Sequence, residues 1–275
     1  MTLYHYCSAA AFYGILHNRE IWLSSLNASN DTHEGIWLSR LLGDVGDWAD
    51  LSSHVWREVA NRLEEFHFRT DCVGFCLSSQ RDLLSQWRGY ASNGAGFCIG
   101  FNEEIFLELA KLKPFDGARL ETVQYDVNKQ LRYVERQLKV CFPAGRHHKL
   151  NPLTYRLDGG ARAAKLMEVG SLDAEGIALA FWRSMYIMKN PAFSEEQEFR
   201  FLLEIDRPDP ASEYMVKGDT LVPYRVAKFP ATLKTPIIDV ILGPRNMTPT
   251  EVVQGFLEKA MYEGVNVWRS GASYR

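Results

Sequence analysis

The sequence has few of the features that mark secreted, zinc-binding or membrane proteins. Its 275 residues include five cysteines, an odd number, and no Cys-x-x-Cys pair, which argues against a disulfide framework or a zinc ribbon. No window approaches the roughly 18 apolar residues of a transmembrane helix, and residues 1–20 lack a charged segment followed by an apolar run. We therefore expect a cytoplasmic protein with free thiols and no membrane partner.

Several common catalytic motifs are also missing. The chain has no G-x-G-x-x-G before a helix, no P-loop, no H-E-x-x-H and no G-x-S-x-G, which excludes the enzyme classes built on them. The net charge is −3, so there is no overall basic field for nucleic acid. One basic run, 146–149 (RHHK), is more typical of a solvated loop than of a phosphate contact.

Apolar patterns predict strands and helices that do not alternate strictly. Short β-branched and aromatic runs predict strands at 3–6, 21–24, 71–78, 96–101, 121–126, 199–203, 220–226, 237–242 and 266–269. Helical spacing predicts helices at 8–18, 36–42, 52–68, 83–90, 103–113, 127–141, 161–188 and 249–262, the last capped by Thr248 or Thr250. This order favours one α+β domain over residues 1–275, with a mostly antiparallel sheet and flanking helices.

Polar and aromatic candidates for a ligand site gather around the first two expected strands. They are His5, Tyr6, Trp22, Ser24, Asn30 and Asp31. A His between aromatic residues is more often structural, whereas in a site it would hydrogen-bond a ligand hydroxyl or amide. Asp31, His33 and Glu34 have metal-ligand chemistry, but no second cluster has matching spacing, so a turn followed by a helix cap is favoured.

Two later segments carry further candidates. Arg88, between Trp87 and Tyr90, either stacks on a ring at the surface or binds phosphate oxygens, and the residues leave both open. The acidic run 195–198 (EEQE) precedes a strand. Such runs are usually solvated, but in an extended chain Glu196, Glu198 and Arg200 share one side. A carboxylate there could accept a ribose hydroxyl or stabilise an oxocarbenium-like transition state.

Taken in order, these blocks resemble the bacterial Domain of Unknown Function 2971 family. The resemblance covers residues 3 to about 245 and leaves the closing helix and strand, 249–269, outside. It is carried by LYHY (3–6), IWLS (21–24), ND (30–31) with Glu34, FCLS (75–78) with Trp87, YA (90–91), GFCIGF (96–101) and ExEFR (196–200). Cys7, Thr32 and Phe199 depart from the Thr, Pro and Trp usual in the family.

That family is in turn similar, more remotely, to the ADP-ribosyltransferase fold, which implies a split, mostly antiparallel sheet and NAD as substrate. In that fold a strand His and a nearby aromatic or Ser residue hold the nicotinamide ribose, here His5 with Trp22 or Ser24. Glu198 would complete the site, and Glu196 would lie near the acceptor. We also expect Tyr6, Arg88 and Tyr90 to contact NAD, with Arg88 as the clamp on the pyrophosphate, and Asn30 with Asp31 to shape the rim of the site.

The leading expectation is therefore an NAD-dependent ADP-ribosyltransferase acting on a nucleic acid or protein acceptor, in a toxin or phage-defence setting. One alternative is a module of the same fold that binds a nucleotide or a partner without chemistry. A second is a metal-dependent nuclease built on Asp31, Glu34 and Glu198, although metal binding is disfavoured by the spacing.

Overall fold

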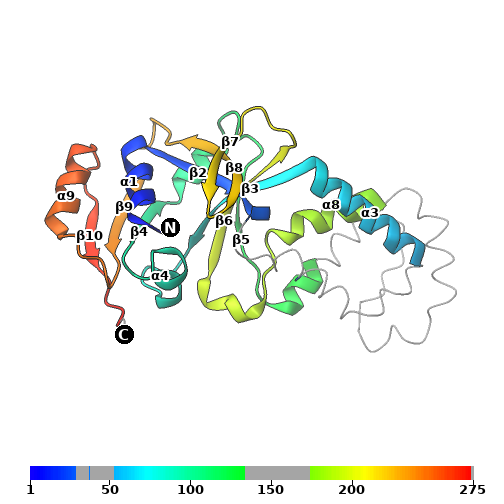
Figure 1. The fold of residues 1–275 in the computed structure, drawn as a ribbon, viewed down its shortest axis with the longest axis horizontal. Coiled ribbons are helices and arrows are strands. Elements are labelled where there is room, and N and C mark those ends of the chain that lie inside the picture. The colour runs from blue at the N-terminus through cyan, green and yellow to red at the C-terminus, as the bar shows by residue number, and fades with distance from the viewer. Residues whose placement is uncertain (29–36, 38–52, 134–173, 274–275) are drawn as a thin grey trace.

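The computed structural model of the chain describes residues 1–28, 37, 53–133 and 174–273. Over these residues it has one mixed sheet flanked by helices (Figure 1). The strands are β1 (Thr2–Cys7), β2 (Glu20–Ser25), β3 (Thr70–Ser78), β4 (Phe97–Asn102), β5 (Arg119–Thr122), β6 (Glu198–Asp206), β7 (Glu213–Lys217), β8 (Thr220–Lys228), β9 (Ile237–Leu242) and β10 (Asn266–Arg269). The helices are α1 (Ala9–Asn18), α3 (Ser53–Arg69), α4 (Leu84–Tyr90), α5 (Glu104–Leu109), α8 (Ala174–Met185) and α9 (Thr250–Lys259), with short 3-10 turns η1 (Leu26–Ala28) and η4 (Pro191–Glu196).

Strand β3 is the centre of the sheet because it pairs with three other strands, β1, β2 and β6. Its whole length pairs with β6 on one edge, from Thr70↔Asp206 to Ser78↔Glu198. On its other edge β1 pairs only at Ser78, and β2 pairs only at Gly74 and Val73. From there β1 leads to β4, β9 and β10, whereas β2 leads to β8 and β7. The two arms of the sheet therefore separate along β3, opposite Cys76.

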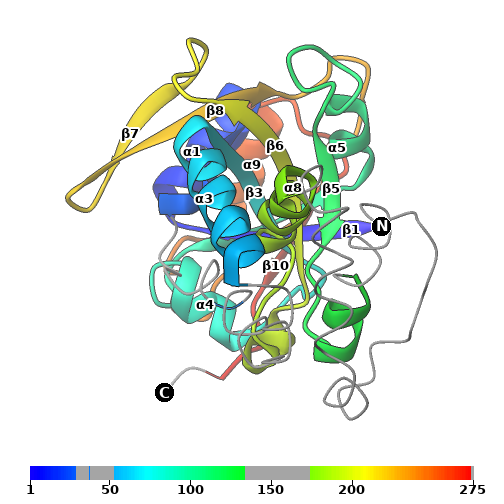
Figure 2. The same cartoon turned by 90° about the vertical axis from the view of Figure 1, so that its right-hand side faces the viewer.

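The main core lies on one face of this sheet. Alternation along β3 turns Val73, Phe75 and Leu77 into it, beside Phe201 of the paired strand β6. Helices α1, α5 and α9 bury apolar residues against this face, including Phe12, Phe106 and Leu257. The opposite face carries α4 over β1 and, farther along, α8 beside α3 (Figure 2).

Most of the predicted elements are present, and the α+β class with a mostly antiparallel sheet is confirmed. Among the described strands only β9 and β10 pair in parallel. The prediction for β5 was wrong by a few residues, since the strand ends at Thr122, and α5 ends early at Leu109. Neither Thr248 nor Thr250 caps α9; its N-cap is Pro249, which has no side-chain donor or acceptor. Strand β7 was not predicted, because its alternating pattern is too short and too exposed.

Candidate functional site

Four buried charged side chains form one compact cluster, which we call the charge cluster: Lys189, Glu196, Glu198 and Arg200. Lys189 Nζ lies 2.8 Å from Glu196 Oε2 and 3.3 Å from Glu198 Oε2, so one ammonium bridges two carboxylates. Arg200 binds both oxygens of Glu198, with Nε 2.7 Å from Oε1 and Nη2 2.9 Å from Oε2. Two cations therefore balance two anions, and each of the four side chains is largely buried.

The local sequence explains how these side chains meet. Glu198 and Arg200 alternate on β6 and pair with Ser78 and Cys76, so both point to the face opposite the main core. The prediction that Glu196 shares this strand was wrong: it ends η4, and Gln197 then adopts a left-handed conformation (φ 42°) that starts β6. Lys189 is fixed through its backbone, whose N–H donates to Gln124 O at 3.1 Å.

The environment moves the two carboxyl groups in opposite directions. Burial alone would raise the pKa of Glu198, but Arg200 and then Lys189 outweigh it and lower the pKa to about 2. The pKa of Glu196 is raised, because burial costs its charged form more than Lys189 returns. Pairs of carboxyl groups whose environments separate their pKa values in this way are typical of acid–base sites. Arg200 and Lys189 hold Glu198 ionised, and burial makes Glu196 the more readily protonated of the two carboxyl groups.

Three further groups surround the charge cluster. The Tyr125 hydroxyl accepts from the Glu198 backbone N–H at 3.1 Å. The thiol of Cys76, which is exposed, donates a hydrogen bond to Glu198 and helps to lower its pKa. Tyr90 of α4 is about half exposed, and burial of its ring together with the charge of Glu196 raises its pKa to about 12. This side of the sheet thus has two tyrosine hydroxyls, a thiol and two carboxylates within a small region.

The end of β3 holds η4 in place through Ser78. Its hydroxyl donates to Glu196 O at 2.6 Å and accepts from Gln80 N at 2.9 Å, and the side chain is buried. Next to it, Ser79 Oγ donates to Gln197 Oε1 at 2.8 Å in an exposed setting. The position of the Glu196 backbone thus depends on Ser78 in particular.

We expect Ser78→Ala to lower the free energy of unfolding by about 1–3 kcal/mol, because it leaves a buried carbonyl and a partly buried N–H unpaired. Ser79→Ala is the matched control, and we expect less than about 1 kcal/mol because water can replace its exposed hydrogen bond. Urea titration followed by circular dichroism measures both. Equal losses in the two variants would contradict the assigned role of Ser78.

His5 lies on the other face of the sheet from Glu198. Tyr4 pairs with Ser78, which pairs with Glu198, so those three share a face, and His5 joins the core face of Leu3. The His5 ring stacks on Phe75 at 4.1 Å, and Nδ1 donates to Cys76 O at 2.8 Å, opposite the place where β1 and β2 separate. A carbonyl can only accept, so Nδ1 carries the proton. Burial lowers the pKa of His5 to about 4, which leaves Nε2 an acceptor at neutral pH.

Trp22 and Ser24 lie on the face that also carries Glu198. Ser24 pairs with Gly74, which pairs with Leu202 of β6, and Leu202 shares the face of Glu198 and Arg200. Trp22, two residues earlier, stacks on Tyr224 at 4.3 Å and donates through Nε1 to Glu20 at 3.0 Å. Trp22 and Ser24 thus lie on the same side of the sheet as the charge cluster, whereas His5 lies at the gap where β1 and β2 separate.

The remaining candidates differ in burial and in whether the structure describes them. The Tyr6 hydroxyl is engaged by the loop before α4, since it donates to Gln80 O at 2.7 Å and accepts from Leu83 N at 2.9 Å. Arg88 is exposed on α4. Asn30 and Asp31, like the runs 33–34 and 146–149, lie outside the described residues.

The described residues contain free thiols and no cluster of metal-ligating side chains. Within them no group of three or more His, Cys, Asp or Glu side chains could hold a metal ion. Cys7, Cys72, Cys76 and Cys98 are free thiols. In that part of the chain no helix is long and apolar enough to cross a membrane.

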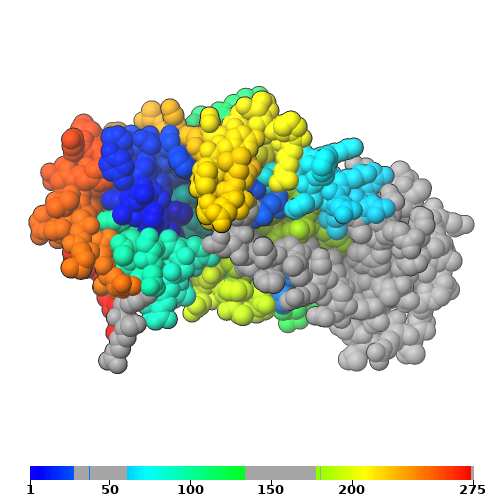
Figure 3. Space-filling model, in the orientation of Figure 1, coloured from blue at the N-terminus to red at the C-terminus, as the bar shows by residue number. Residues whose placement is uncertain are grey.

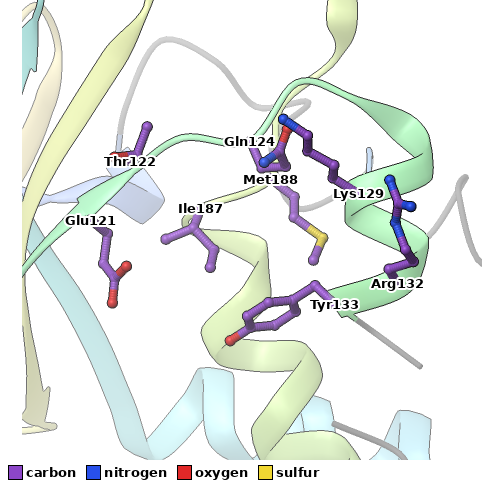
Figure 4. Close-up of a pocket in the computed structure, with 8 residues that line it drawn as sticks. All are labelled: Glu121, Thr122, Gln124, Lys129, Arg132, Tyr133, Ile187 and Met188. Atoms are coloured by element: carbon purple, nitrogen blue, oxygen red, sulfur yellow. The ribbon is translucent and has the colours of Figure 1, made fainter. Parts of the chain in front are cut away.

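A separate pocket of about 470 Å³ lies between β5 and the segment after α8 (Figure 4). Its lining is mixed in charge and polarity: Glu121, Thr122, Gln124, Lys129, Arg132, Tyr133, Ile187 and Met188. None of the residues expected at a ligand site from the sequence belongs to it. Lys189 and Tyr125, which directly follow two of its lining residues, instead reach the charge cluster.

Sequence reasoning missed three of the residues at this site, Lys189, Tyr125 and Cys76. Lys189 looked like the end of a helix before Asn190-Pro191, and Tyr125 looked like part of a strand. A usable signal for Lys189 was its closeness in sequence to Glu196 and Glu198, because a lysine is seldom buried without such partners. Tyr125 carried no signal of its own.

Comparison with known protein families supports the family resemblance over part of the chain. A model of the family described as "Protein of unknown function (DUF2971)" matches residues 86–201. The matched segment contains Tyr90 and the whole charge cluster, whereas His5, Trp22 and Ser24 precede it. No curated protein and no solved structure matched the chain. None of these comparisons connects it to ADP-ribosyltransferases.

Proposed function

We propose that the protein cleaves the nicotinamide–ribose bond of NAD and transfers ADP-ribose to a nucleic acid or protein acceptor. The observation that carries the proposal is the pair of neighbouring carboxyl groups with opposite pKa shifts. Arg200 holds Glu198 ionised, whereas the pKa of Glu196 is raised. Breaking this bond releases neutral nicotinamide and leaves positive charge on the ribose. A fixed carboxylate stabilises that charge, and a second carboxylate takes the proton of the attacking acceptor.

The other residues have chemistry suited to positioning. Trp22 and Ser24, on the Glu198 face, would hold the nicotinamide ribose by stacking and by a hydroxyl. His5, neutral at physiological pH, would accept a ribose hydroxyl through Nε2 at the gap between β1 and β2. Arg88 would bind the pyrophosphate, for which an exposed guanidinium is well suited. Tyr90, at the end of α4, is near enough to Glu196 for that charge to raise its pKa, and it would contact the cofactor.

The test is incubation of the purified protein with labelled NAD and a cell extract, scored by released nicotinamide and by transferred label. We expect Glu198→Gln to lower the rate by about a hundredfold, as when one preorganised electrostatic group is removed from a site. Glu204→Gln, on the same strand, is the matched control, because Glu204 pairs with Arg119 and Arg183 outside the charge cluster. Absence of both products with the unmodified protein would overturn the proposal.

One observation favours a second candidate, a module that binds a nucleotide or a partner without turnover. Both oxygens of Glu198 already accept hydrogen bonds from Arg200, and one of them also contacts Lys189, which limits what a ligand could add. Calorimetry with NAD separates the two functions. Binding that is unchanged in Glu198→Gln, without nicotinamide release, would support the module.

A further inference from the structure

Strand β7 forms an open edge of the sheet. It ends the strand order and pairs only with β8 among the described strands. Figure 2 shows the β7–β8 hairpin projecting from the body, and Figure 3 shows its yellow surface at the front of the molecule. Tyr214 is 57% exposed, Val216 77% and Leu221, opposite Val216 on β8, 64%. Large apolar side chains on a projecting edge strand are unusual in a monomer.

The turn determines which backbone groups of β7 face outward. Lys217 pairs with Thr220 across the two-residue turn Gly218-Asp219, where Gly218 has φ +59°. Residues that flank such a turn exchange both backbone hydrogen bonds, and the pattern alternates along the strand. Glu213, Met215 and Lys217 therefore direct their N–H and C=O groups to β8. Tyr214 and Val216 direct theirs to the open edge.

We propose that two copies of this chain associate by antiparallel pairing of their β7 strands about a two-fold axis at Met215. In this register Tyr214 of one copy faces Val216 of the other, and the outward backbone groups of the two residues meet as hydrogen-bonded pairs. Met215 faces its own counterpart. Glu213 faces Lys217 at both ends of the interface, so each copy contributes one half of two ion pairs.

The charge pattern is what selects a second copy as the occupant. Charged residues on edge strands usually prevent pairing. In β7, however, the single Glu and the single Lys lie at equal distances on either side of the strand centre, at Glu213 and Lys217. Antiparallel self-pairing places unlike charges opposite each other in closely spaced, non-hydrogen-bonded positions. The exposed side chains of Tyr214 and Val216 cover each other in the same register.

Two short strands bury little area, so we expect association in the micromolar to millimolar range. Sedimentation velocity over that range measures it. Glu213→Lys places like charges opposite each other twice, and we expect the dissociation constant to rise at least about tenfold. Lys217→Glu should act alike. The double exchange Glu213→Lys/Lys217→Glu restores unlike pairs and should restore the wild-type constant. Glu263→Lys, an equal charge change at an exposed site away from β7, is the control.

A cross-link tests the register. Met215→Cys places two thiols across the axis, and we expect a disulfide dimer on mild oxidation. Lys217→Cys should give none, because residue 217 faces residue 213 of the second copy. A monomer at all concentrations, or a dimer that tolerates Glu213→Lys, would overturn the proposal. So would failure of the double exchange to recover association. These experiments do not depend on NAD chemistry.

Discussion

Arg200→Met is expected to lower the free energy of unfolding at neutral pH by about 3–5 kcal/mol, the cost typical of breaking a buried ion pair. Arg200 is 2% exposed and supplies two of the hydrogen bonds that Glu198 accepts. Its removal leaves a buried carboxylate facing Lys189, which is already shared with Glu196. The loss of stability arises because the Glu198 charge loses the partner that binds both of its oxygens. Lost packing volume contributes little, since Met fills much of the same space.

The same substitution should remove a dependence of stability on pH. In the wild type the pKa of Glu198 falls from 4.5 to about 2 on folding. A lowered carboxyl pKa stabilises the fold above pH 4.5, and this contribution, about 3 kcal/mol, is lost as the pH falls from 4.5 through 2. Without Arg200, burial raises the pKa of Glu198. In this variant burial disfavours the charged form of Glu198, so protonation at low pH no longer destabilises the fold. The loss of stability near pH 4 to 2 should therefore disappear.

Urea unfolding at a series of pH values measures both effects. Arg183→Met is the matched control, because Arg183 pairs with Glu204 on the same strand while its side chain is 50% exposed. An exposed pair contributes below about 1 kcal/mol. Arg200→Met/Glu198→Gln should recover part of the stability, since no unpaired charge remains. Similar losses in Arg183→Met and Arg200→Met would show that the charge cluster does not have the assigned energetic role.

The sequence allowed the secondary elements to be predicted better than their pairing. Ser8 caps α1 as its position indicated, and β3 follows its apolar run closely. The face on which a side chain lies depends on register between strands far apart in the chain. A shift of one residue in Tyr4↔Ser78 would have put His5 on the Glu198 face, and no local pattern in β1 specifies it.

The candidate site shows the same division. The residues at 196–200 were recognisable, but their burial was not, because a run of glutamates is usually solvated. Glu196 and Glu198 can be buried because Lys189 and Arg200 pair with them. Lys189 directly precedes the turn at Asn190-Pro191, and Arg200 lies on the same strand as Glu198. The stability of such a cluster comes from the geometry of its ion pairs. Composition and periodicity do not contain that geometry.

Trp87→Ala is expected to lower the free energy of unfolding by about 3–5 kcal/mol, as is usual when a fully buried Trp is truncated. Trp87 is 0% exposed and packs edge-on against Tyr6, with ring centroids 4.9 Å apart. Its Nε1 donates to Asp82 Oδ1 at 2.6 Å. Asp82 also accepts from Ser270 Oγ and Gly271 N, so the indole and the C-terminal segment meet at one carboxylate.

Trp87→Phe separates volume from hydrogen bonding. It keeps most of the ring but removes the donor to Asp82, and we expect a loss of about 1–2 kcal/mol. Trp22→Ala is the control for a large exposed indole, with less than about 1 kcal/mol expected. Because Asp82 accepts from both the Trp87 indole and the C-terminal segment, Trp87→Phe should also increase hydrogen exchange in α4 and in 270–272 together. If exchange rises in α4 alone, then Asp82 does not couple the C-terminal segment to the helix that borders the charge cluster.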